Sequence, residues 1–233
     1  MIRLDKLLSH MGYGSRKDVK KIIRQGRVEI NGEYIFDDDI KVNELEDEIF
    51  IDNNMIDSYK ENIYIMLNKP KNVVSATFDF NDETVVDLVS EYVSYKIFPV
   101  GRLDKDTEGL ILLTNDGKLA HSLLSPKKHI EKEYYAELDG DLTQKMIDIF
   151  GKGVVLDDGY ICKSSKLIPI NSRTARVIIY EGKYHQIKRM FNSVGINVIF
   201  LKRKRMGTLN LDENLKSGEY RLLTSQEIDK IKL

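Results

Sequence analysis

Cysteine is nearly absent from this chain of 233 residues, which contains only Cys162. A single thiol excludes a disulfide within the chain and cannot hold a metal cluster by itself, so we expect a reducing compartment. Histidine is also scarce, at four residues, and neither an HxxxH nor a CxxC spacing occurs. The sequence therefore predicts no metal site.

Long apolar runs and nucleotide-binding motifs are missing as well. The first residues, Met1–Asp5, lack the apolar core of a signal peptide, and no run approaches the length that spans a membrane. The phosphate-binding GxxxxGKS/T, the dinucleotide-binding GxGxxG and the nucleophile elbow GxSxG do not occur. We expect a cytoplasmic monomer that does not contact a membrane and needs no cofactor.

The chain also lacks a large net charge, because its formal charge is only −1. The charges are nevertheless unevenly distributed. Residues 1–27 hold eight Lys or Arg and two acids, residues 28–57 hold eleven acids and one base, and residues 183–205 hold seven bases and no acid. Phosphate binding depends on such local clusters, so the neutral total does not exclude a nucleic-acid partner. With 42% hydrophobic and 31% charged residues, the composition is that of an ordinary globular protein.

The N-terminal segment has the pattern of two short helices. From Leu4 to Met11, apolar residues recur at i, i+3, i+4 and i+7, which predicts one apolar helix face, and Gly12 breaks this helix. Ser15, with Asp18 three residues on, predicts a capping box that begins a second helix.

A hairpin is predicted directly after these helices. Gly26 ends the second helix as a left-handed cap, and Asn31–Gly32 is a strong hairpin turn signal. The second helix carries basic residues without the interspersed acids that a merely solvated face would have. Residues 3–33 resemble an S4 RNA-binding domain in pattern and spacing. This resemblance implies phosphate contacts from the basic residues of the module, which are Arg3, Lys6, Arg16, Lys17, Lys20, Arg24 and Arg27.

An acidic stretch, residues 37–57, follows the basic module. Its acids alternate with apolar residues and offer no ligand set of fixed spacing, so a metal site is not expected. We predict that the stretch ends the module, forms the linker, and serves solubility or repels RNA phosphates. The predicted domains are residues 1–58 and residues 59–233.

A polar decapeptide at residues 101–110, GRLDKDTEGL, lies between two apolar segments. A turn held against a buried strand is a common place for reactive side chains, although most charged turns are simply solvated. Earlier in the chain, an apolar strand at residues 63–67 is followed by Asn68–Pro70. Both segments resemble motifs of the pseudouridine synthases of the bacterial ribosomal type, which implies that Asp104 is the catalytic residue. Asn72 stands where the family has glycine, and asparagine tolerates the positive φ of such a turn.

Two later segments resemble further motifs of the same family. Lys132–Tyr134 matches a KxY motif, which implies that Tyr134 stacks on the target base; an ordinary core or edge tyrosine is the alternative. Residues 183–191, KYHQIKRMF, match a motif in which the residue after HQ-aliphatic pairs with the catalytic aspartate. That residue is Lys188, where related enzymes mostly carry arginine. Because lysine lacks the bidentate fork of arginine, we expect a geometrically looser pair.

The helix that follows Lys183 begins with basic residues, which oppose the helix dipole unless an anion lies there. An RNA phosphate or the catalytic carboxylate would be such an anion. Residues 202–205 are all basic and form either a second phosphate-contacting strip or an exposed basic strand. The further RNA contacts that the resemblance implies are Arg102, His185, Gln186 and Arg189.

The resemblance covers nearly the whole chain and implies an α+β protein. A small S4 (αL-type) RNA-binding domain would precede a catalytic domain with a mixed, mainly antiparallel sheet flanked by helices, which isomerises a uridine to pseudouridine without a cofactor. Residues 181–195 and 205–224 are most similar to the small-subunit enzymes of the family. The expected partner is therefore 16S ribosomal RNA or a small-subunit assembly intermediate. A 23S ribosomal RNA substrate, or a non-catalytic RNA-binding assembly factor, are the alternatives.

Overall fold

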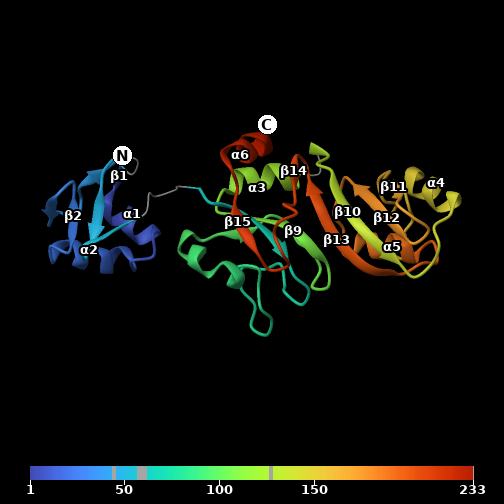
Figure 1. Ribbon diagram of the computed structural model, residues 1–233, viewed down its shortest axis with the longest axis horizontal. Helices are drawn as coiled ribbons and strands as arrows, with labels where there is room; N and C mark the ends of the chain where they lie inside the picture. The colour runs from blue at the N-terminus through green and yellow to red at the C-terminus, as the bar shows by residue number, and fades with distance from the viewer. Residues whose placement is uncertain (44–45, 57–61, 126–127, 233) are drawn as a thin grey trace. The chain divides into compact units, whose positions relative to one another are not determined.

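The structure, a computed structural model, describes residues 1–43, 46–56, 62–125 and 128–232. It divides into two compact units (Figure 1). The first comprises Met1–Ile63 and Glu91–Ile97, and the second comprises Tyr64–Ser90 and Phe98–Leu233. The boundary predicted between residues 58 and 59 lies outside the described residues.

The first unit packs two short helices against a small antiparallel sheet, in the strand order β3-β2-β5-β6, while β1 pairs with β4. Its core is formed by apolar residues of both helices and of β2 and β5. The elements are β1 (Ile2–Arg3), α1 (Leu4–His10), α2 (Arg16–Arg24), β2 (Val28–Ile30), β3 (Glu33–Ile35), β4 (Lys41–Val42), β5 (Ile49–Ile51) and β6 (Asn54–Met55).

Local signals in the sequence determine where these elements begin and end. The Ser15 hydroxyl accepts a hydrogen bond from the backbone N–H of Asp18 at 3.3 Å, which confirms the predicted cap of α2. Gly26 follows α2 with φ of +68°, and Asn31 and Gly32 adopt φ of +51° and +88° in the β2–β3 turn. These are the left-handed conformations that the predicted cap and hairpin require.

The acidic stretch belongs to the first unit, so its interpretation as a linker is wrong for the described part. Val42, Ile49, Ile51 and Ile56, which alternate with the acids, are all buried in the core of this unit. In β4 and β5 the buried residues alternate with less buried ones, which is the pattern of half-buried strands.

The second unit is built on a nine-stranded sheet with the order β11-β12-β10-β13-β9-β7-β15, in which β14 pairs with β13 and β8 with β9. All pairs are antiparallel except that of β9 and β13, which confirms the predicted mixed, mainly antiparallel sheet. No described helix is long and apolar enough to cross a membrane. The elements are β7 (Tyr64–Lys69), β8 (Phe98–Pro99), β9 (Glu108–Thr114), α3 (Gly117–Leu124), β10 (Lys132–Leu138), α4 (Gln144–Lys152), β11 (Lys166–Pro169), β12 (Thr174–Ile179), α5 (Gln186–Asn192), β13 (Val198–Met206), β14 (Leu209–Asn210), β15 (Tyr220–Leu222) and α6 (Ser225–Lys232). The 3-10 helix η1 (Asp87–Tyr95) begins in this unit, and its residues from Glu91 on belong to the first unit.

Helices α3 and α6 lie over the β7 and β9 part of this sheet (Figure 1). Apolar residues of α3, such as Leu119 and Leu123, share a core with Met66, Leu110 and Leu112 of these strands. Both strands are buried along nearly their whole length, so they form the rigid centre of the unit.

The parallel pairing of β9 and β13 is short and depends on a glycine. Gly109 lies opposite Arg203, and a Cβ atom at residue 109 would come within 2.3 Å of the Arg203 carbonyl oxygen. Gly109 also has φ of +102°, a conformation that other residues rarely adopt. This close approach places the polar turn that precedes β9 beside the middle of β13.

Candidate functional site

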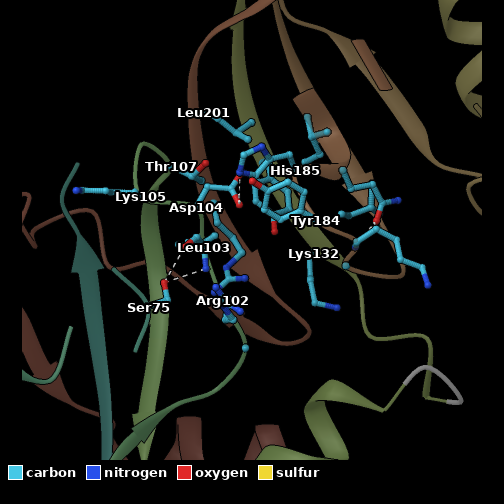
Figure 2. Close-up of a pocket in the computed structure, with 18 of the residues that line it drawn as sticks. Ser75, Arg102, Leu103, Asp104, Lys105, Thr107, Lys132, Tyr184, His185 and Leu201 are labelled. Carbon is cyan, nitrogen blue, oxygen red and sulfur yellow. Dashed lines mark hydrogen bonds and ion pairs between the residues drawn. The ribbon is translucent and has the colours of Figure 1, made fainter. Parts of the chain in front are cut away.

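A cavity of about 540 Å³ opens in the second unit where β9, β10 and β13 meet the start of α5. The turn before β9 forms one wall, and the segment from Gly182 to Ile187 forms another (Figure 2). Asp104 and Tyr134, two residues predicted from the sequence, line this cavity together. In the described part of the chain, no group of three or more His, Cys, Asp or Glu residues is arranged to hold a metal ion.

The turn that carries Asp104 is held by side chains from the segment after β7. The Ser75 hydroxyl donates to the Leu103 carbonyl at 2.8 Å and accepts from the Leu103 N–H at 3.0 Å, as Figure 2 shows. Asn72 adopts φ of +66°, and its N–H donates to the Lys105 carbonyl at 2.8 Å. The asparagine therefore makes the left-handed turn predicted for it, next to the loop with Asp104.

Lys69 supports the same turn from within the protein. Its side chain is completely buried, and its ammonium donates to the carbonyls of Pro70, Lys105 and Thr107 at 3.0, 3.3 and 2.9 Å. Burial lowers the pKa of Lys69 to about 8, although the nearby carboxylates of Asp106 and Asp104 favour its charged form. These contacts make Lys69 a structural support of the turn.

Lys188 of α5 lies between two carboxylates of the turn. Its ammonium is 3.3 Å from Asp104 Oδ2 and also donates a hydrogen bond to Asp106. Burial alone would raise the pKa of Asp106, but the hydrogen bond and charge of Lys188 outweigh it, and the pKa lies below its ordinary value. On the other side, His185 Nε2 is 3.7 Å from Asp104 Oδ1. The expected Lys188–Asp104 pair is present, but the sequence did not indicate that Asp106 shares the lysine.

Tyr134 lies on β10, opposite Arg203 of β13 and Val177 of β12, and is only 7% exposed. Tyr134 is thus packed in the sheet and also lines the cavity, and its stacking on the target base stays a prediction. A rigidly held aromatic ring at a cavity wall can stack on a planar ligand.

Two cations of the cavity were missed as site residues. Arg203 is 2% exposed, its Nε donates to the Leu110 carbonyl at 2.7 Å, and its Nη2 has no hydrogen-bond partner among the described residues. Lys132 lines the same cavity, and its pKa is lowered by burial and by the charge of Arg203. The cavity therefore combines one carboxylate, Asp104, with buried positive charge, an arrangement suited to an anionic or carbonyl-rich ligand.

Residues 202–205 were predicted to form a phosphate-contacting strip or an exposed basic strand. Neither prediction describes Arg203 or Arg205. Arg203 points into the protein, and Arg205 binds Glu131 and Glu133 at 2.8 and 3.1 Å. Both residues belong to strand β13, whose register against β10 shifts between them, so that Arg203 lies opposite Tyr134 and Arg205 lies opposite Glu133.

Two predicted RNA contacts serve the protein itself. Gln186 is 4% exposed; its Nε2 donates to Glu181 Oε1 at 3.0 Å and its Oε1 accepts from the Lys183 N–H at 2.9 Å. Arg189 lies in ion pairs with Asp157 and Asp158 and does not line the cavity. In this structure both side chains hold α5 to neighbouring loops, and RNA contact by them stays a prediction. Arg102, His185 and Gln186 line the cavity.

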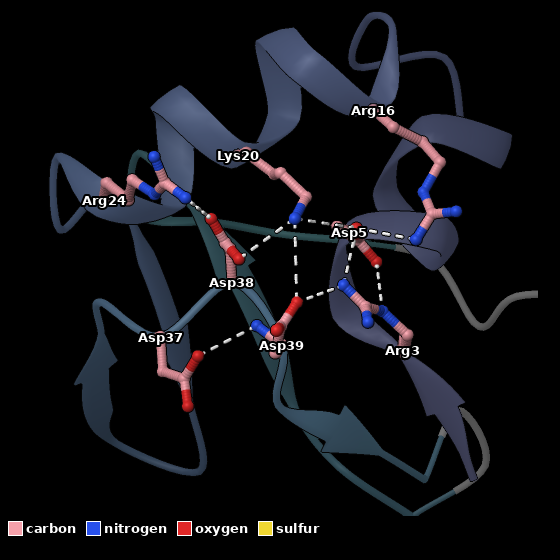
Figure 3. Close-up of polar contacts among 8 residues, drawn as sticks. All are labelled: Arg3, Asp5, Arg16, Lys20, Arg24, Asp37, Asp38 and Asp39. Atoms are coloured by element: carbon pink, nitrogen blue, oxygen red, sulfur yellow. Dashed lines mark hydrogen bonds and ion pairs between the residues drawn. The ribbon is translucent and has the colours of Figure 1, made fainter.

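The basic face of the first unit is interleaved with acids, contrary to the sequence-based interpretation (Figure 3). Asp5, whose side chain is fully buried, accepts hydrogen bonds from Arg3 Nε and Arg16 Nη2 at 3.1 and 2.8 Å. Although burial raises the pKa of Asp5, these bonds outweigh it and lower the pKa to about 2.

The loop between β3 and β4 supplies the other acids. Asp38 lies 3.2 Å from Lys20 Nζ and 2.7 Å from Arg24 Nη2, and Asp39 contacts Lys20 and Arg3. Figure 3 shows these carboxylates beneath α2. Arg27 pairs with Asp52 outside this network. Thus five of the seven basic residues predicted to bind RNA are held by carboxylates, whereas Lys6 and Lys17 are exposed.

Matches to two known protein families identify the class of protein. The description "RNA pseudouridylate synthase" matches residues 63–193, and "S4 domain" matches residues 2–43. The chain belongs to the RNA pseudouridine synthase family and carries an N-terminal S4 domain. It is thus an isomerase that acts on RNA.

Similar proteins span essentially the full chain. An RNA pseudouridine synthase of Bacillus subtilis (strain 168), named YtzG and described as uncharacterized, is 46% identical over 97% of both chains. Ribosomal small subunit pseudouridine synthase A of Yersinia pestis is 40% identical, covering 99% of this chain and 98% of the relative. A crystal structure of a pseudouridylate synthase superposes with a TM-score of 0.70 at 36% identity, covering 99% of this chain and 100% of the other.

Proposed function

We propose that the protein isomerises one uridine of 16S ribosomal RNA to pseudouridine, with Asp104 as the catalytic residue. The observation that carries the catalytic assignment is the cavity in which the Asp104 carboxylate, 3.3 Å from the Lys188 ammonium, faces the same space as Tyr134. The 16S assignment is supported by relatives named ribosomal small subunit pseudouridine synthase A, such as that of Yersinia pestis at 40% identity.

The reaction exchanges one bond for another within the nucleotide. The bond from ribose C1′ to uracil N1 breaks, the base turns in the cavity, and a bond from C1′ to C5 forms. C5 loses a proton and N1 gains one, so no external reagent is consumed. A carboxylate beside the sugar and base is the group that this chemistry needs, and Asp104 supplies it.

Lys188 keeps that carboxylate in its charged form when the base is bound. An aspartate in water is ionised at neutral pH, but a docked base excludes water and disfavours the charge. The neighbouring ammonium offsets this effect. Because Lys188 also binds Asp106, its position is fixed from two sides before RNA arrives.

The target uridine must leave its RNA structure to reach Asp104, at a cost of a few kcal/mol. Stacking on Tyr134 and phosphate contacts by the S4 domain would offset this cost. We further propose that the enzyme acts as a cytoplasmic monomer, without a cofactor, on 16S RNA or on a small-subunit assembly intermediate.

Tritium release from 5-³H-uridine-labelled RNA tests this proposal. Wild type and Asp104→Asn are incubated with labelled 16S RNA, with labelled 23S RNA as the control. Asparagine keeps the shape of the side chain and removes its charge, so we expect release from 16S by wild type and a loss of ~10²–10⁴-fold or more in the variant. Release from 23S alone would overturn the substrate and keep the chemistry. Tight binding without release from any RNA or ribosomal particle would favour a binding factor.

A further inference from the structure

Tyr184 is an aromatic residue that the proposed reaction leaves without a role. It is 74% exposed, although burial of an aromatic ring is strongly favourable, and it lines the cavity of Asp104. Its ring is stacked on His185, with centroids 3.8 Å apart and planes at 18°. Figure 2 shows the two rings beside Asp104 at the cavity. With one face covered by the imidazole and most of its surface exposed, the tyrosine offers its other face to a ligand.

The backbone beneath Tyr184 is held in place. Gln186 and Glu181, both buried, are hydrogen-bonded to each other at 3.0 Å, and Gln186 also accepts from the N–H of Lys183. His185 adopts φ of +48°, a left-handed conformation that is uncommon outside glycine and often found at functional sites. The two stacked rings are therefore presented by an ordered turn, and little conformational entropy would be lost when a ligand binds.

The charge around Tyr184 selects the kind of ligand. Arg102, Lys132 and Arg203 line the same cavity, so a polyanion is attracted to it. Nucleotide bases stack on exposed aromatic rings in single-stranded RNA recognition, whatever the base. A nucleotide has a flat base that can stack on the ring and a phosphate that the surrounding cations attract, so it fits this part of the cavity.

We propose that Tyr184, backed by His185, is a stacking platform for the base of a nucleotide adjacent to the target uridine. The target base itself must reach Asp104 and Tyr134 inside the cavity, which leaves the exposed ring for a neighbour. This inference rests on RNA being the substrate and does not depend on its being 16S. It makes Tyr184 a positioning residue that orients the strand entering the cavity.

Three variants separate the ring from the hydroxyl and from apolar area: Tyr184→Ala, Tyr184→Phe and Tyr184→Leu. The exposed position keeps folding intact, which thermal unfolding checks. In the tritium assay, on whichever labelled RNA the wild type modifies, we expect kcat/KM to fall by about 5- to 100-fold in the alanine and leucine variants. The phenylalanine variant keeps the ring and should stay within about twofold of wild type. Equal loss with phenylalanine would show that the hydroxyl matters and would overturn the proposal.

The decisive measurement combines the Tyr184→Ala change in the protein with the removal of a single base from the RNA. Two further RNAs each carry an abasic nucleotide, one on the 5′ side and one on the 3′ side of the modified uridine. If Tyr184 stacks on one of these bases, Tyr184→Ala has no further effect on the RNA that lacks it. An undiminished effect on both abasic RNAs, or no effect of Tyr184→Ala on intact RNA, overturns the proposal.

A failure of the proposed function is distinguishable from a failure of the platform. If wild type modifies 23S and not 16S RNA, the same comparison is made on 23S. If wild type modifies no RNA, filter binding to 16S RNA replaces the rate. Weaker binding by Tyr184→Ala than by Tyr184→Phe then supports the platform, and equal binding overturns it.

Discussion

At the scale of single residues, Lys188 shows how one lysine can hold two carboxylates of the same turn. Its ammonium contacts Asp104 and Asp106, which lie two residues apart on one turn. A point charge with three donors can bind two separate carboxylates, whereas the planar guanidinium is suited to the two oxygens of one carboxylate. The second acid, Asp106, thus compensates for the absence of the bidentate fork.

Lys188→Met should lower kcat by about 10- to 100-fold, because hydrogen bonds to charged groups contribute about 1.5–3 kcal/mol. Lys188→Arg restores the positive charge and should recover most of the rate. Tritium release at saturating RNA measures both variants. A methionine variant as active as wild type would show that Asp104 needs no cationic partner.

At the scale of elements, the turn between β8 and β9 is held mainly by hydrogen bonds from its neighbours. Lys69 of β7 donates to three carbonyls, two of them within this turn, and Ser75 binds both polar backbone groups of Leu103. A short polar turn has little apolar surface to bury, so these bonds fix its conformation.

Lys69→Met should lower the melting temperature and kcat together. Methionine has a similar length but leaves buried carbonyls without a donor, at a cost of about 1–3 kcal/mol for each unsatisfied group. Thermal unfolding and single-turnover tritium release measure the two effects. Ser75→Ala is the companion variant: it removes hydrogen bonds to the same turn without touching a charge. If kcat is unchanged in both variants, the hydrogen bonds that hold this turn are not needed for catalysis.

Within the S4 domain, the loop between β3 and β4 places carboxylates against basic residues that are predicted to bind RNA phosphates. Asp38 and Asp39 bind Arg3, Lys20 and Arg24 in the absence of RNA. On the prediction that these basic residues bind RNA, RNA would have to replace internal ion pairs, and we expect this to weaken binding to a phosphate backbone.

Changing Asp38 and Asp39 to Asn should increase the affinity for unrelated single-stranded RNA by about 1.5- to 5-fold per released pair, given that such pairs contribute about 0.2–1 kcal/mol. We also expect log Kd to depend more steeply on salt concentration in this variant than in wild type. Asp139→Asn with Asp141→Asn is the control, because it removes the same charge from the other unit. A gain no larger than that of the control would show that the loop does not compete with RNA.

The signals that the sequence carried well are local ones. The cap at Ser15 and the turns at Gly26, Asn31 and Asn72 depend on residues that are neighbours in the chain, and each forms as predicted. The cavity residues Asp104 and Tyr134 were found because they lie in short motifs with a family resemblance.

The residues that the sequence analysis missed depend on contacts between distant segments. Arg203 enters the cavity because β13 pairs with β10 in one register, which no local pattern specifies. The acids of the β3–β4 loop lie against α2 because the chain folds back, so counting charges along residues 16–24 did not reveal them. The ion pairs of Arg189 were missed for the same reason, since Asp157 and Asp158 lie about thirty residues away in the chain.

At the scale of the whole molecule, each unit has its own apolar core and its own ion pairs. Asp5 joins two arginines in the first unit. In the second unit, Arg221 of β15 forms two hydrogen bonds with Glu227 of α6, at 2.8 and 2.9 Å. Separate cores are the structural basis for separate unfolding transitions.

Asp5→Asn should therefore lower the stability of the first unit only, and Glu227→Gln that of the second only. Each change removes a charged hydrogen-bond partner, for which we expect a loss of about 1–3 kcal/mol. Calorimetry at pH 7 would show which transition moves. A shift of both transitions by either variant would mean that the units unfold as one.

Acid should weaken the second unit through Glu227. The hydrogen bonds from Arg221 lower the pKa of Glu227 from its ordinary 4.5 to about 2. Because the folded-state pKa is the lower one, this carboxylate stabilises the fold fully above pH 4.5, and the contribution is lost as the pH falls through about 2. Urea unfolding between pH 5 and pH 2 should show a shallower decline for Glu227→Gln than for wild type. Parallel curves of stability against pH for the two proteins would show that Glu227 is not responsible for the loss of stability in acid.

The pairing of β9 with β13 also governs when the enzyme becomes competent during its synthesis. The first unit has all its described residues by Ile97, whereas the wall of the cavity opposite Asp104 is complete only once Arg203 has been made. At about 5–20 residues per second, the ribosome needs roughly 5–20 s to cover that distance. On the proposed assignment of this cavity as the catalytic site, a nascent chain would be able to bind RNA during this interval but not to modify it, and a chain that terminates before β13 would lack the cavity wall formed by Arg203.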